Sequence, residues 1–377
     1  MDSGDLLNEE ESIPSSIQQS ARLKAEHIAE LYKIIGIDAV NVGEYDLALG
    51  IGYLKDLAKK IDFPFISANI VDAGNAPVFP RYVIKNIGGK NVGIMGLIGD
   101  TGDIPNKVKE ITNGEASVTD AIAAATSVVE ELKGKVDYIV AITHQQANRD
   151  YVVARRVSGI DAVVGGHDKQ RTGDPIVVDD KTLIVRAGEK GQYLGMLEVD
   201  FTANKEWKHN LVPLGDDIAD DAKIKGIITA YNDKIFDMYS GEGEAGVNPA
   251  ASAVLQNEKC GACHAPHLKQ WKTTDHAKAY TTLFERARNY DPTCLNCHTV
   301  RFEQPNGFNM KEQPMSLVNV QCEACHGDAK EHLTTFQKSA IPTPRPTVEV
   351  CAKCHTSDRN PNLVPDQKIF MDKIKHQ

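Results

Sequence analysis

Every cysteine in this chain of 377 residues belongs to a closely spaced pair that is followed at once by a histidine. The eight cysteines form four copies of the motif Cys-x-x-Cys-His, all within the last third of the sequence. The four motifs are Cys260, Cys263 and His264; Cys294, Cys297 and His298; Cys322, Cys325 and His326; and Cys351, Cys354 and His355. In this motif the two thiols form thioethers to the vinyl groups of a c-type haem, and the histidine becomes the proximal ligand of the iron. We therefore predict four covalently bound haems.

Other sites that use paired cysteines explain this pattern less well. Zinc ribbons, disulfide frameworks and thioredoxin-like redox pairs all contain closely spaced cysteines. None of them requires a histidine directly after each second cysteine. The chain has 12 histidines in 377 residues, so four such placements by chance have odds of roughly one in a million under the definition of the motif. The pattern favours haem attachment.

The composition of the chain divides it into three parts. We expect a first domain at residues 1–215, a helix and a Gly-rich linker at residues 216–247, and the haem domain at residues 248–377. Four haems in about 130 residues leave little room for a core of side chains, so we expect the porphyrins to form the apolar interior. The haem domain should then consist mostly of short helices and irregular loops.

The first domain has the pattern of a layered α/β fold, in which short β-rich runs alternate with amphipathic helical segments. A hairpin is predicted from residues 82–87 and 91–97, joined by a glycine-rich turn. Two later strands end in His144 and His167. Because α/β sheets bind their ligands at the carboxyl ends of their strands, we expect both histidines to lie near a ligand site.

A series of short motifs in this domain resembles the 5′-nucleotidase branch of the calcineurin-like metallophosphoesterases. The motifs are Asp2-Ser-Gly-Asp5, Asn41-Val-Gly-Glu-Tyr-Asp46, Ser67-Ala-Asn69, Thr143-His144 and Gly165-Gly-His167-Asp168. In that family a two-metal centre of Asp, Asn and His ligands activates water against a phosphoester. By this resemblance Asp5, His144 and His167 match ligand positions.

The sequence departs from the family pattern at several ligand positions. The strand with the family's Asp-x-His pair would precede Met1, and the Asn-His pair of the Gly-Asn-His-Glu motif aligns with Val42 and Gly43. Lys169 replaces the second histidine of the Gly-His-x-His motif and would repel cations. We therefore expect no phosphoesterase activity and no metal ion in this domain. The haem irons of the other domain would then be the metals of the chain. Asp5, His144 and His167 are then polar side chains without a function at the strand ends. Alternatively, Lys169 and backbone amides form an anion pocket there.

The haem domain is similar to the cytochrome c554 family of tetrahaem proteins, and more distantly to the hydroxylamine-oxidoreductase-like multihaem enzymes. The similarity rests on the four motifs in order and on the segments around His276, His332 and His376, which match distal ligands of that family. The implied axial pairs are His264 with His332, His355 with His276, and His326 with His376. The haem on His298 has no distal histidine by this resemblance and would be five-coordinate.

An open haem iron can bind a small ligand, whereas iron with two histidine ligands only relays electrons. Arg301 and His267 are candidate donors of positive charge or protons near the His298 haem. His267 has two further interpretations: it lies at the surface or a porphyrin edge, or it closes the open haem as a distal ligand.

The leading hypothesis is an exported multihaem cytochrome that transfers electrons and reduces a small oxyanion at the His298 haem. Selenite, tellurite, nitrite and other nitrogen oxides are candidate substrates, the first two because similar fusions occur in metalloid-respiring bacteria. Two alternatives stay open: an electron-relay cytochrome that forms a homo-oligomer or filament, and a phosphoesterase with a redox-sensing haem domain. The first two hypotheses require redox partner proteins, such as other multihaem cytochromes.

Attachment of c-type haem takes place outside the cytoplasm, so we expect a periplasmic or extracellular protein. The segment from Met1 to Glu11 has no basic region, apolar core or cleavage site of a signal peptide. No stretch of the sequence has the length and apolar character of a membrane span. We expect that a signal peptide was removed or that the true start lies upstream. The net charge of −10 argues against binding to nucleic acid.

Overall fold

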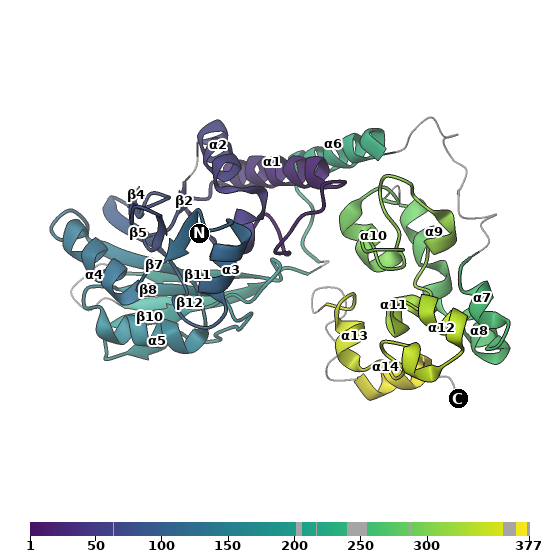
Figure 1. Ribbon diagram of the computed structural model, residues 1–377. Helices are drawn as coiled ribbons and strands as arrows, with labels where there is room; N and C mark the ends of the chain where they lie inside the picture. Colours follow the sequence, from purple (N-terminus) through teal and green to yellow (C-terminus); the bar gives the residue numbers. More distant parts are fainter. Residues whose placement is uncertain are drawn as a thin grey trace. The chain divides into compact units, whose positions relative to one another are not determined.

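The computed structural model describes residues 1–62, 64–200, 206–215, 217–239, 255–286, 288–356 and 367–374. The chain forms two compact units, which are coloured along the sequence in Figure 1. The first unit comprises Met1–Ile13 and Ala21–Lys225, and the second comprises Pro14–Ser20 and Gly226–Gln377. The division after Lys225 lies within helix α6 (Ala222–Tyr239), and the expected linker at 240–247 lies outside the described residues.

The first unit is built on a six-stranded sheet with the strand order β4-β5-β7-β8-β10-β9. The strands are β4 (Tyr82–Ile87), β5 (Lys90–Ile98), β7 (Tyr138–Gln145), β8 (Ala162–His167), β9 (Ile176–Val178) and β10 (Thr182–Val185). The four central strands are parallel, whereas the edge strands β4 and β9 are antiparallel to their neighbours. Every residue of β7 is buried, as expected for a parallel strand covered on both faces.

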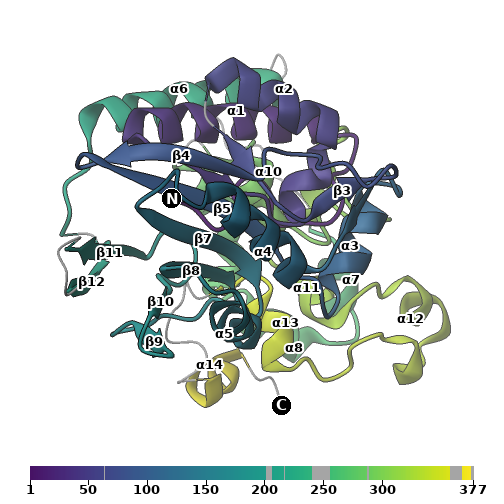
Figure 2. The same cartoon turned by 90° about the vertical axis from the view of Figure 1, so that its left-hand side faces the viewer.

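Alternate residues of the sheet enter different hydrophobic clusters. Ile139 and Ala141 pack with helices α4 (Ala121–Leu132) and α5 (Ala147–Arg156), which lie along one face of the sheet (Figure 2). Val140 belongs to a separate cluster on the opposite face. This two-residue alternation is the geometry of a strand buried on both sides, and it confirms the expected layered α/β fold.

The first unit also contains several helices and short strands outside the six-stranded sheet. The helices are α1 (Gln18–Ile35), η1 (Tyr45–Leu49), α2 (Ile51–Ile61) and α3 (Ile104–Ile111), and the short strands are β1 (Val40–Asn41), β2 (Phe65–Ile66), β3 (Ile70–Asp72), β6 (Ala116–Val118), β11 (Tyr193–Val199) and β12 (Trp207–Pro213). Strand β1 pairs in parallel with β2. The amide nitrogen of Asn41 donates to the carbonyl of Leu97 at 2.8 Å, so a side chain links β1 to β5.

The second unit consists of short helices and loops, as the sequence predicts. Its helices are α7 (Glu258–Gly261), α8 (Ala265–Trp271), η2 (Asp275–Lys278), α9 (Ala279–Phe284), α10 (Pro292–His298), η3 (Met315–Leu317), α11 (Cys322–His326), α12 (Lys330–Thr335), η4 (Lys338–Ala340), α13 (Val348–Ala352) and α14 (Gln367–Ile374). In the parts of both units that the structure describes, no helix is both long and apolar enough to cross a membrane.

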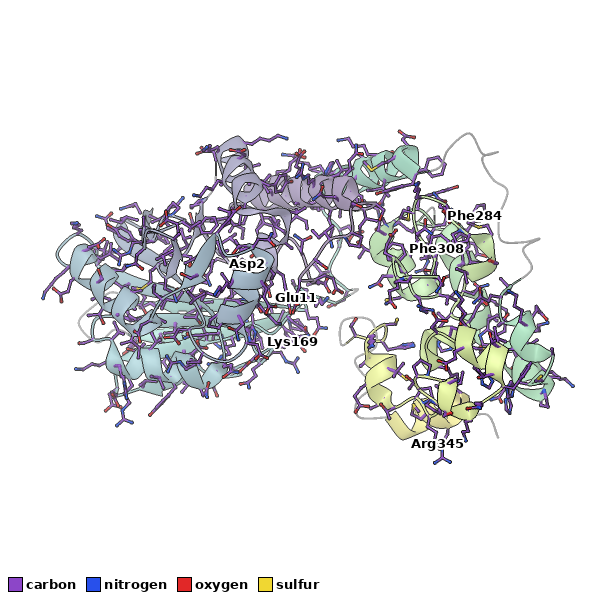
Figure 3. The ribbon with its side chains drawn as sticks, in the orientation of Figure 1. Asp2, Glu11, Lys169, Phe284, Phe308 and Arg345 are labelled. Carbon is purple, nitrogen blue, oxygen red and sulfur yellow. The ribbon has the colours of Figure 1, made fainter. Side chains whose placement is uncertain are left out.

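The unit also contains a small core of side chains. A cluster of buried side chains gathers around α9 and α10, with Phe308 among them (Figure 3). Its buried members are Tyr280, Leu283, Leu295, Val300, Phe302, Phe308, Met310, Leu317 and Val318. Ile17 and Tyr239, from outside residues 248–377, also pack against the cluster.

Residues 14–20 are held within the second unit by polar contacts as well. The hydroxyl of Ser16 donates to a carboxylate oxygen of Glu303 at 2.6 Å. The hydroxyl of Tyr239 donates to Ser20 Oγ at 2.9 Å. Residues 14–20, which lead into α1, therefore complete a unit whose other residues come from the C-terminal part of the sequence.

Candidate functional sites

The cysteine motifs lie on or beside short helices of the second unit. None of the eight cysteines, all of which are described, forms a disulfide, and Cys263 is the exposed one while the other seven are half-buried. All eight thiols are thus in a state from which thioethers to haem can form.

Two pairs of histidine rings have the spacing of axial haem ligands. The ring centres of His264 and His332 lie 6.3 Å apart, and those of His276 and His355 lie 6.0 Å apart. An imidazole nitrogen binds a transition metal at about 2 Å, and its ring centre lies about 1 Å farther out, so two axial imidazoles have ring centres about 6 Å apart. The residues present therefore fit a haem iron between the members of each pair.

The Nδ1 atoms of three haem-domain histidines, two of them from the cysteine motifs, are held by the backbone. Nδ1 of His298 lies 2.6 Å from the carbonyl oxygen of Ala279, and Nδ1 of His326 lies 2.9 Å from that of Thr343. Nδ1 of His332 lies 2.9 Å from the carbonyl of Gln337. A carbonyl oxygen can only accept, so each Nδ1 carries the proton and each Nε2 presents its lone pair. Iron-binding histidines are commonly oriented in this way.

The structure places the other expected haem-site residues as follows. The ring of His267 stacks on that of His264, with ring centres 5.6 Å apart and planes 15° apart. Arg301 Nη1 lies 2.7 Å from an oxygen of Asp328, so this guanidinium is engaged in an ion pair. His376, the expected distal ligand opposite His326, lies outside the described residues.

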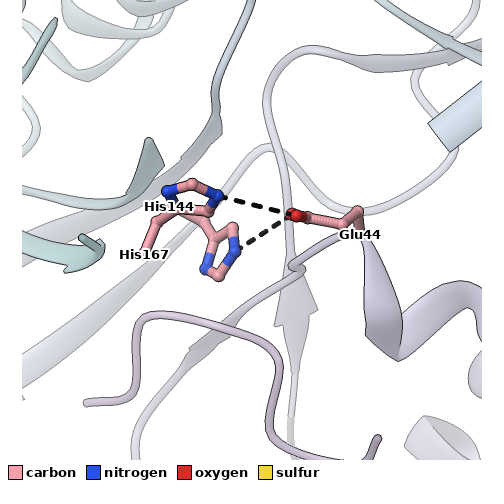
Figure 4. Close-up of side chains that lie close together, drawn as sticks. All are labelled: Glu44, His144 and His167. Atoms are coloured by element: carbon pink, nitrogen blue, oxygen red, sulfur yellow. Dashed lines mark ion pairs between the residues drawn. The ribbon is translucent and has the colours of Figure 1, made fainter. Parts of the chain in front are cut away.

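In the first unit, the structure brings His144 and His167 together with a residue that the sequence analysis missed, Glu44. His144 lies in β7, His167 ends β8, and Glu44 directly precedes η1. Both histidines face the Glu44 carboxylate (Figure 4): Nε2 of His144 lies 3.0 Å from Oε2, and Nε2 of His167 lies 3.7 Å from Oε1. The signal was available in the sequence, because Glu44 is the glutamate of the motif whose Asn-His pair has been lost.

Asp5 joins the same cluster from the N-terminal loop. Its Oδ2 lies 3.1 Å from Nε2 of His144, and its Oδ1 accepts a hydrogen bond from the amide of Tyr45 at 2.8 Å. Asp5 and His167 both have left-handed backbone conformations, with φ of 57° and 72°. Such conformations are costly for residues other than glycine and persist where the surrounding structure holds them.

The electrostatics of the cluster are dominated by its two carboxylates. Burial alone would lower the pKa of His144, but hydrogen bonding and charge from Asp5 and Glu44 raise it to about 10. Although burial acts in the opposite direction, the two histidines hold the pKa of Glu44 below its usual value. The hydrogen bond to Glu44 also raises the pKa of His167. The two carboxylates therefore favour the protonated form of His144.

Lys169 is engaged elsewhere. Its ammonium lies 3.0 Å from a carboxylate oxygen of Glu189, and its side chain is largely exposed. Of the four residues that the sequence analysis assigned to this site, the structure thus brings Asp5, His144 and His167 together and pairs Lys169 with Glu189.

Comparisons with known proteins relate the two parts of the chain to two kinds of protein. A family model for "Cytochrome c554 and c-prime" matches residues 259–327. The chain is 30% identical to cytochrome c-554 of Nitrosomonas europaea over 144 residues, which cover 29% of this chain and 61% of that protein. It is 31% identical to the 5′-nucleotidase of Bos taurus over 245 residues, which cover 58% of this chain and 42% of that protein. The chain thus spans less than two thirds of either relative.

Solved structures support the same assignment of the fold. The 5′-nucleotidase precursor from Thermus thermophilus aligns with a TM-score of 0.51 and 26% identity, covering 62% of this chain and 49% of that one. The sulfate thiohydrolase SoxB of the same species shares the fold, with a TM-score of 0.54 and 19% identity over 70% of this chain and 49% of that one. The chain thus joins a metallophosphoesterase-like domain, similar to 5′-nucleotidases, to a domain similar to cytochrome c554.

Proposed function

We propose that this chain is an exported cytochrome that transfers electrons through four covalently attached haems. The similarity to cytochrome c554 supports a haem electron-transfer role. The observation that carries the proposal is the spacing of the pairs His264–His332 and His276–His355, whose ring centres are 6.3 Å and 6.0 Å apart. Two imidazoles at this spacing would hold a haem iron between them and would leave no coordination position for a substrate.

The protein part of each site fixes the ligands in place. A c-type haem supplies a carrier of single electrons when it is bound. The backbone carbonyls of Ala279, Thr343 and Gln337 orient the imidazoles that they contact, and so direct each Nε2 toward the metal position. The thioethers and these hydrogen bonds restrict movement of the ligands, which favours fast electron transfer.

We further propose that the His298 haem is the site where a small oxyanion is reduced. The resemblance to cytochrome c554 gives this histidine no distal partner, and the stacking of His267 on His264 associates that side chain with another motif. His298 ends α10, and its Nδ1 is fixed by Ala279 at the start of α9. Selenite, tellurite and nitrite are the substrates to test, with redox partner proteins as the electron source.

Low-temperature electron paramagnetic resonance of the oxidised holoprotein tests both proposals. We expect three low-spin haems and one high-spin haem, and we expect added nitrite or selenite to perturb the high-spin signal. The His332→Gln variant should convert one low-spin haem to high spin, because it removes one of two axial ligands. His209→Gln, on strand β12, is the matched control and should leave the spectrum unchanged.

The possible results separate the two parts of the proposal. Four low-spin haems that do not respond to either anion would contradict oxyanion reduction at His298 and favour a relay or filament-forming cytochrome. Fewer than four haems per chain by pyridine haemochrome analysis, or an unchanged spectrum of the His332 variant, would contradict the haem assignment itself.

A further inference from the structure

Phe336 has a backbone conformation that suits glycine better than an aromatic residue. It caps the C-terminal end of α12, with φ of 57° and ψ of 16°, and its backbone amide donates to the carbonyl oxygen of His332. Helices commonly end with glycine in this left-handed conformation, because a Cβ atom is disfavoured there. The phenyl ring at this position is therefore accompanied by backbone strain.

The phenyl ring is not part of the core of its unit. Phe336 is 72% exposed, the highest value among the large apolar residues that the structure describes. Leu333, three residues earlier on α12, is also exposed, and Figure 2 shows this helix on the outer side of the second unit. Strained residues persist mainly at functional positions. Burial within the unit does not offset the strain at Phe336, so a role in contact with another molecule accounts for it better.

The exposed ring lies beside an axial-ligand pair. Nδ1 of His332 lies 2.9 Å from the carbonyl oxygen of Gln337, the residue after Phe336. The ring centre of His332 lies 6.3 Å from that of His264, which belongs to the first haem motif. The haem of this motif is called the first haem below. Electron transfer between proteins slows steeply with distance, so a protein that covers Phe336 is well placed to exchange electrons with the first haem.

The first motif is also the most accessible of the four, all of which are described. Cys263 is exposed, whereas the other seven cysteines are half-buried. His264 is exposed, whereas His298, His326 and His355 are half-buried. The first haem is therefore the one best suited to exchange electrons with another protein.

Lysines flank the two exposed apolar residues. Lys330 begins α12 and Lys338 begins η4, and both side chains are exposed. Residues 330–340 contain one acidic residue, Glu331, and the carboxylate of Asp328, just before them, is neutralised by an ion pair. This part of the surface thus has an apolar centre with a positively charged rim, which complements an apolar patch surrounded by acidic residues.

We propose that an acidic redox protein docks on this surface and exchanges electrons with the first haem. The docking surface, called the α12–η4 surface, comprises Lys330, Leu333, Phe336 and Lys338. Redox partners commonly meet over less than about 1,200 Å², so a small surface is sufficient. Aromatic residues are enriched at protein interfaces, and a few central residues carry most of the binding free energy. This inference rests on the proposed electron-transfer function.

Stopped-flow reduction of the oxidised holoprotein by a plant-type [2Fe–2S] ferredoxin tests the proposal. This ferredoxin is an acidic carrier of single electrons with a low reduction potential. One electron leaves its reduced cluster and converts a ferric haem iron to the ferrous state, which the Soret absorption reports. We expect the second-order rate constant to fall as the ionic strength rises, because salt screens the attraction between the two proteins.

Phe336→Gly separates docking from folding. Glycine relieves the left-handed strain, so the variant should be at least as stable as the wild-type chain. Loss of the ring should lower the rate constant by at least about 5-fold, and Phe336→Tyr should keep the wild-type rate. The double variant Lys330→Glu/Lys338→Glu should lower the rate constant by about 10-fold and weaken its dependence on salt.

Two other exposed positions of the second unit provide matched controls. Ile228→Ala, on α6, and Lys311→Glu should both keep the wild-type rate constant. Dithionite, a small reductant that needs no docking surface, should reduce the haems of every variant at the same rate. Failure of dithionite to reduce the wild-type haems would contradict the electron-transfer function itself, whereas the comparison of variants tests the docking surface.

Three results would overturn the docking proposal. The first is an unchanged rate constant for Phe336→Gly. The second is a changed haem content or low-spin resonance signal in this variant, because the ring would then pack on the porphyrin. The third is a self-association of the wild-type chain, measured by sedimentation velocity, that Phe336→Gly abolishes. In that case a second copy of the chain would occupy the surface.

Discussion

At the scale of single residues, Asp46 is the side chain that organises the N-terminal loop. Its two oxygens accept three amide hydrogen bonds of 2.9–3.0 Å and have no access to solvent. Burial and the charge of Asp5 raise the pKa of Asp46, against the effect of these hydrogen bonds. The loop that carries Asp5 therefore depends on a single buried carboxylate.

We predict that Asp46→Asn destabilises the first unit by about 1–3 kcal/mol, the cost of leaving buried polar groups unpaired. Whichever way the amide is turned, its NH₂ group faces a backbone N–H that needs an acceptor. Chemical denaturation followed by circular dichroism measures the change. Asp56→Asn, an exposed position on α2, is the control and should change stability by less than about 0.5 kcal/mol. Equal stability of the two variants would contradict the role assigned to Asp46.

At the scale of elements, the close approach of β1 and β2 to β5 depends on a glycine. A Cβ atom on Gly96 would lie 2.5 Å from Oδ1 of Asn41 and 2.6 Å from the carbonyl oxygen of Ile66. The second contact is with backbone, which cannot turn aside as a flexible side chain can. The lack of a side chain at Gly96 thus permits the linkage of these strands.

Two glycine substitutions should have opposite effects. Gly96→Ala should destabilise the first unit by about 1–3 kcal/mol, because the added methyl overpacks a buried site. Gly52→Ala, on the exposed face of α2, meets no atom within 4 Å and should stabilise by up to about 1 kcal/mol through the higher helix propensity of alanine. Thermal unfolding of both variants measures these shifts, and a change of the same sign in both would refute the packing argument.

Local signals explain which elements could be predicted from sequence. The hairpin of β4 and β5 is confirmed because Gly88 and Gly89 adopt φ of 59° and 81°, which suits a two-residue turn. Strand β1 spans only Val40–Asn41, because its neighbours are a single bridged residue, Asp2, and the short strand β2. Such partners come from distant parts of the chain and leave no local signal.

The same distinction applies to the sites. The haem motifs are local, so they can be read from sequence, whereas the expected partnership of His264 with His332 came from a family resemblance and not from spacing. Glu44 is not identified from sequence, because the Asn-His pair that precedes this glutamate in the family motif is replaced by Val42 and Gly43. Its approach to His144 and His167 depends on the order of three strands and loops, which sequence patterns do not specify.

At the scale of the whole molecule, the second unit includes a segment from the opposite end of the sequence. Ile17 packs against the cluster around Tyr280 and Phe308, and Ser16 and Ser20 make hydrogen bonds within the same unit. We predict that Ile17→Ala lowers the stability of the haem-bearing unit by about 1–3 kcal/mol, from lost burial and the space left behind.

Denaturant unfolding followed by the haem Soret absorption measures this effect in the unit concerned. Ile35→Ala, at the exposed end of α1, is the matched control and should change the midpoint little. If the Soret transition of Ile17→Ala coincided with that of Ile35→Ala, the segment would not contribute to this unit.

The contact between Ser16 and Glu303 also sets an order of events during synthesis. The two residues are 287 positions apart, so at roughly 5–20 residues per second the ribosome needs about 15–60 s to produce the second after the first. For that time the start of α1 has been made but its partners have not. The second unit therefore reaches its complete packing only after Glu303 has been made, because it includes a segment that left the ribosome long before.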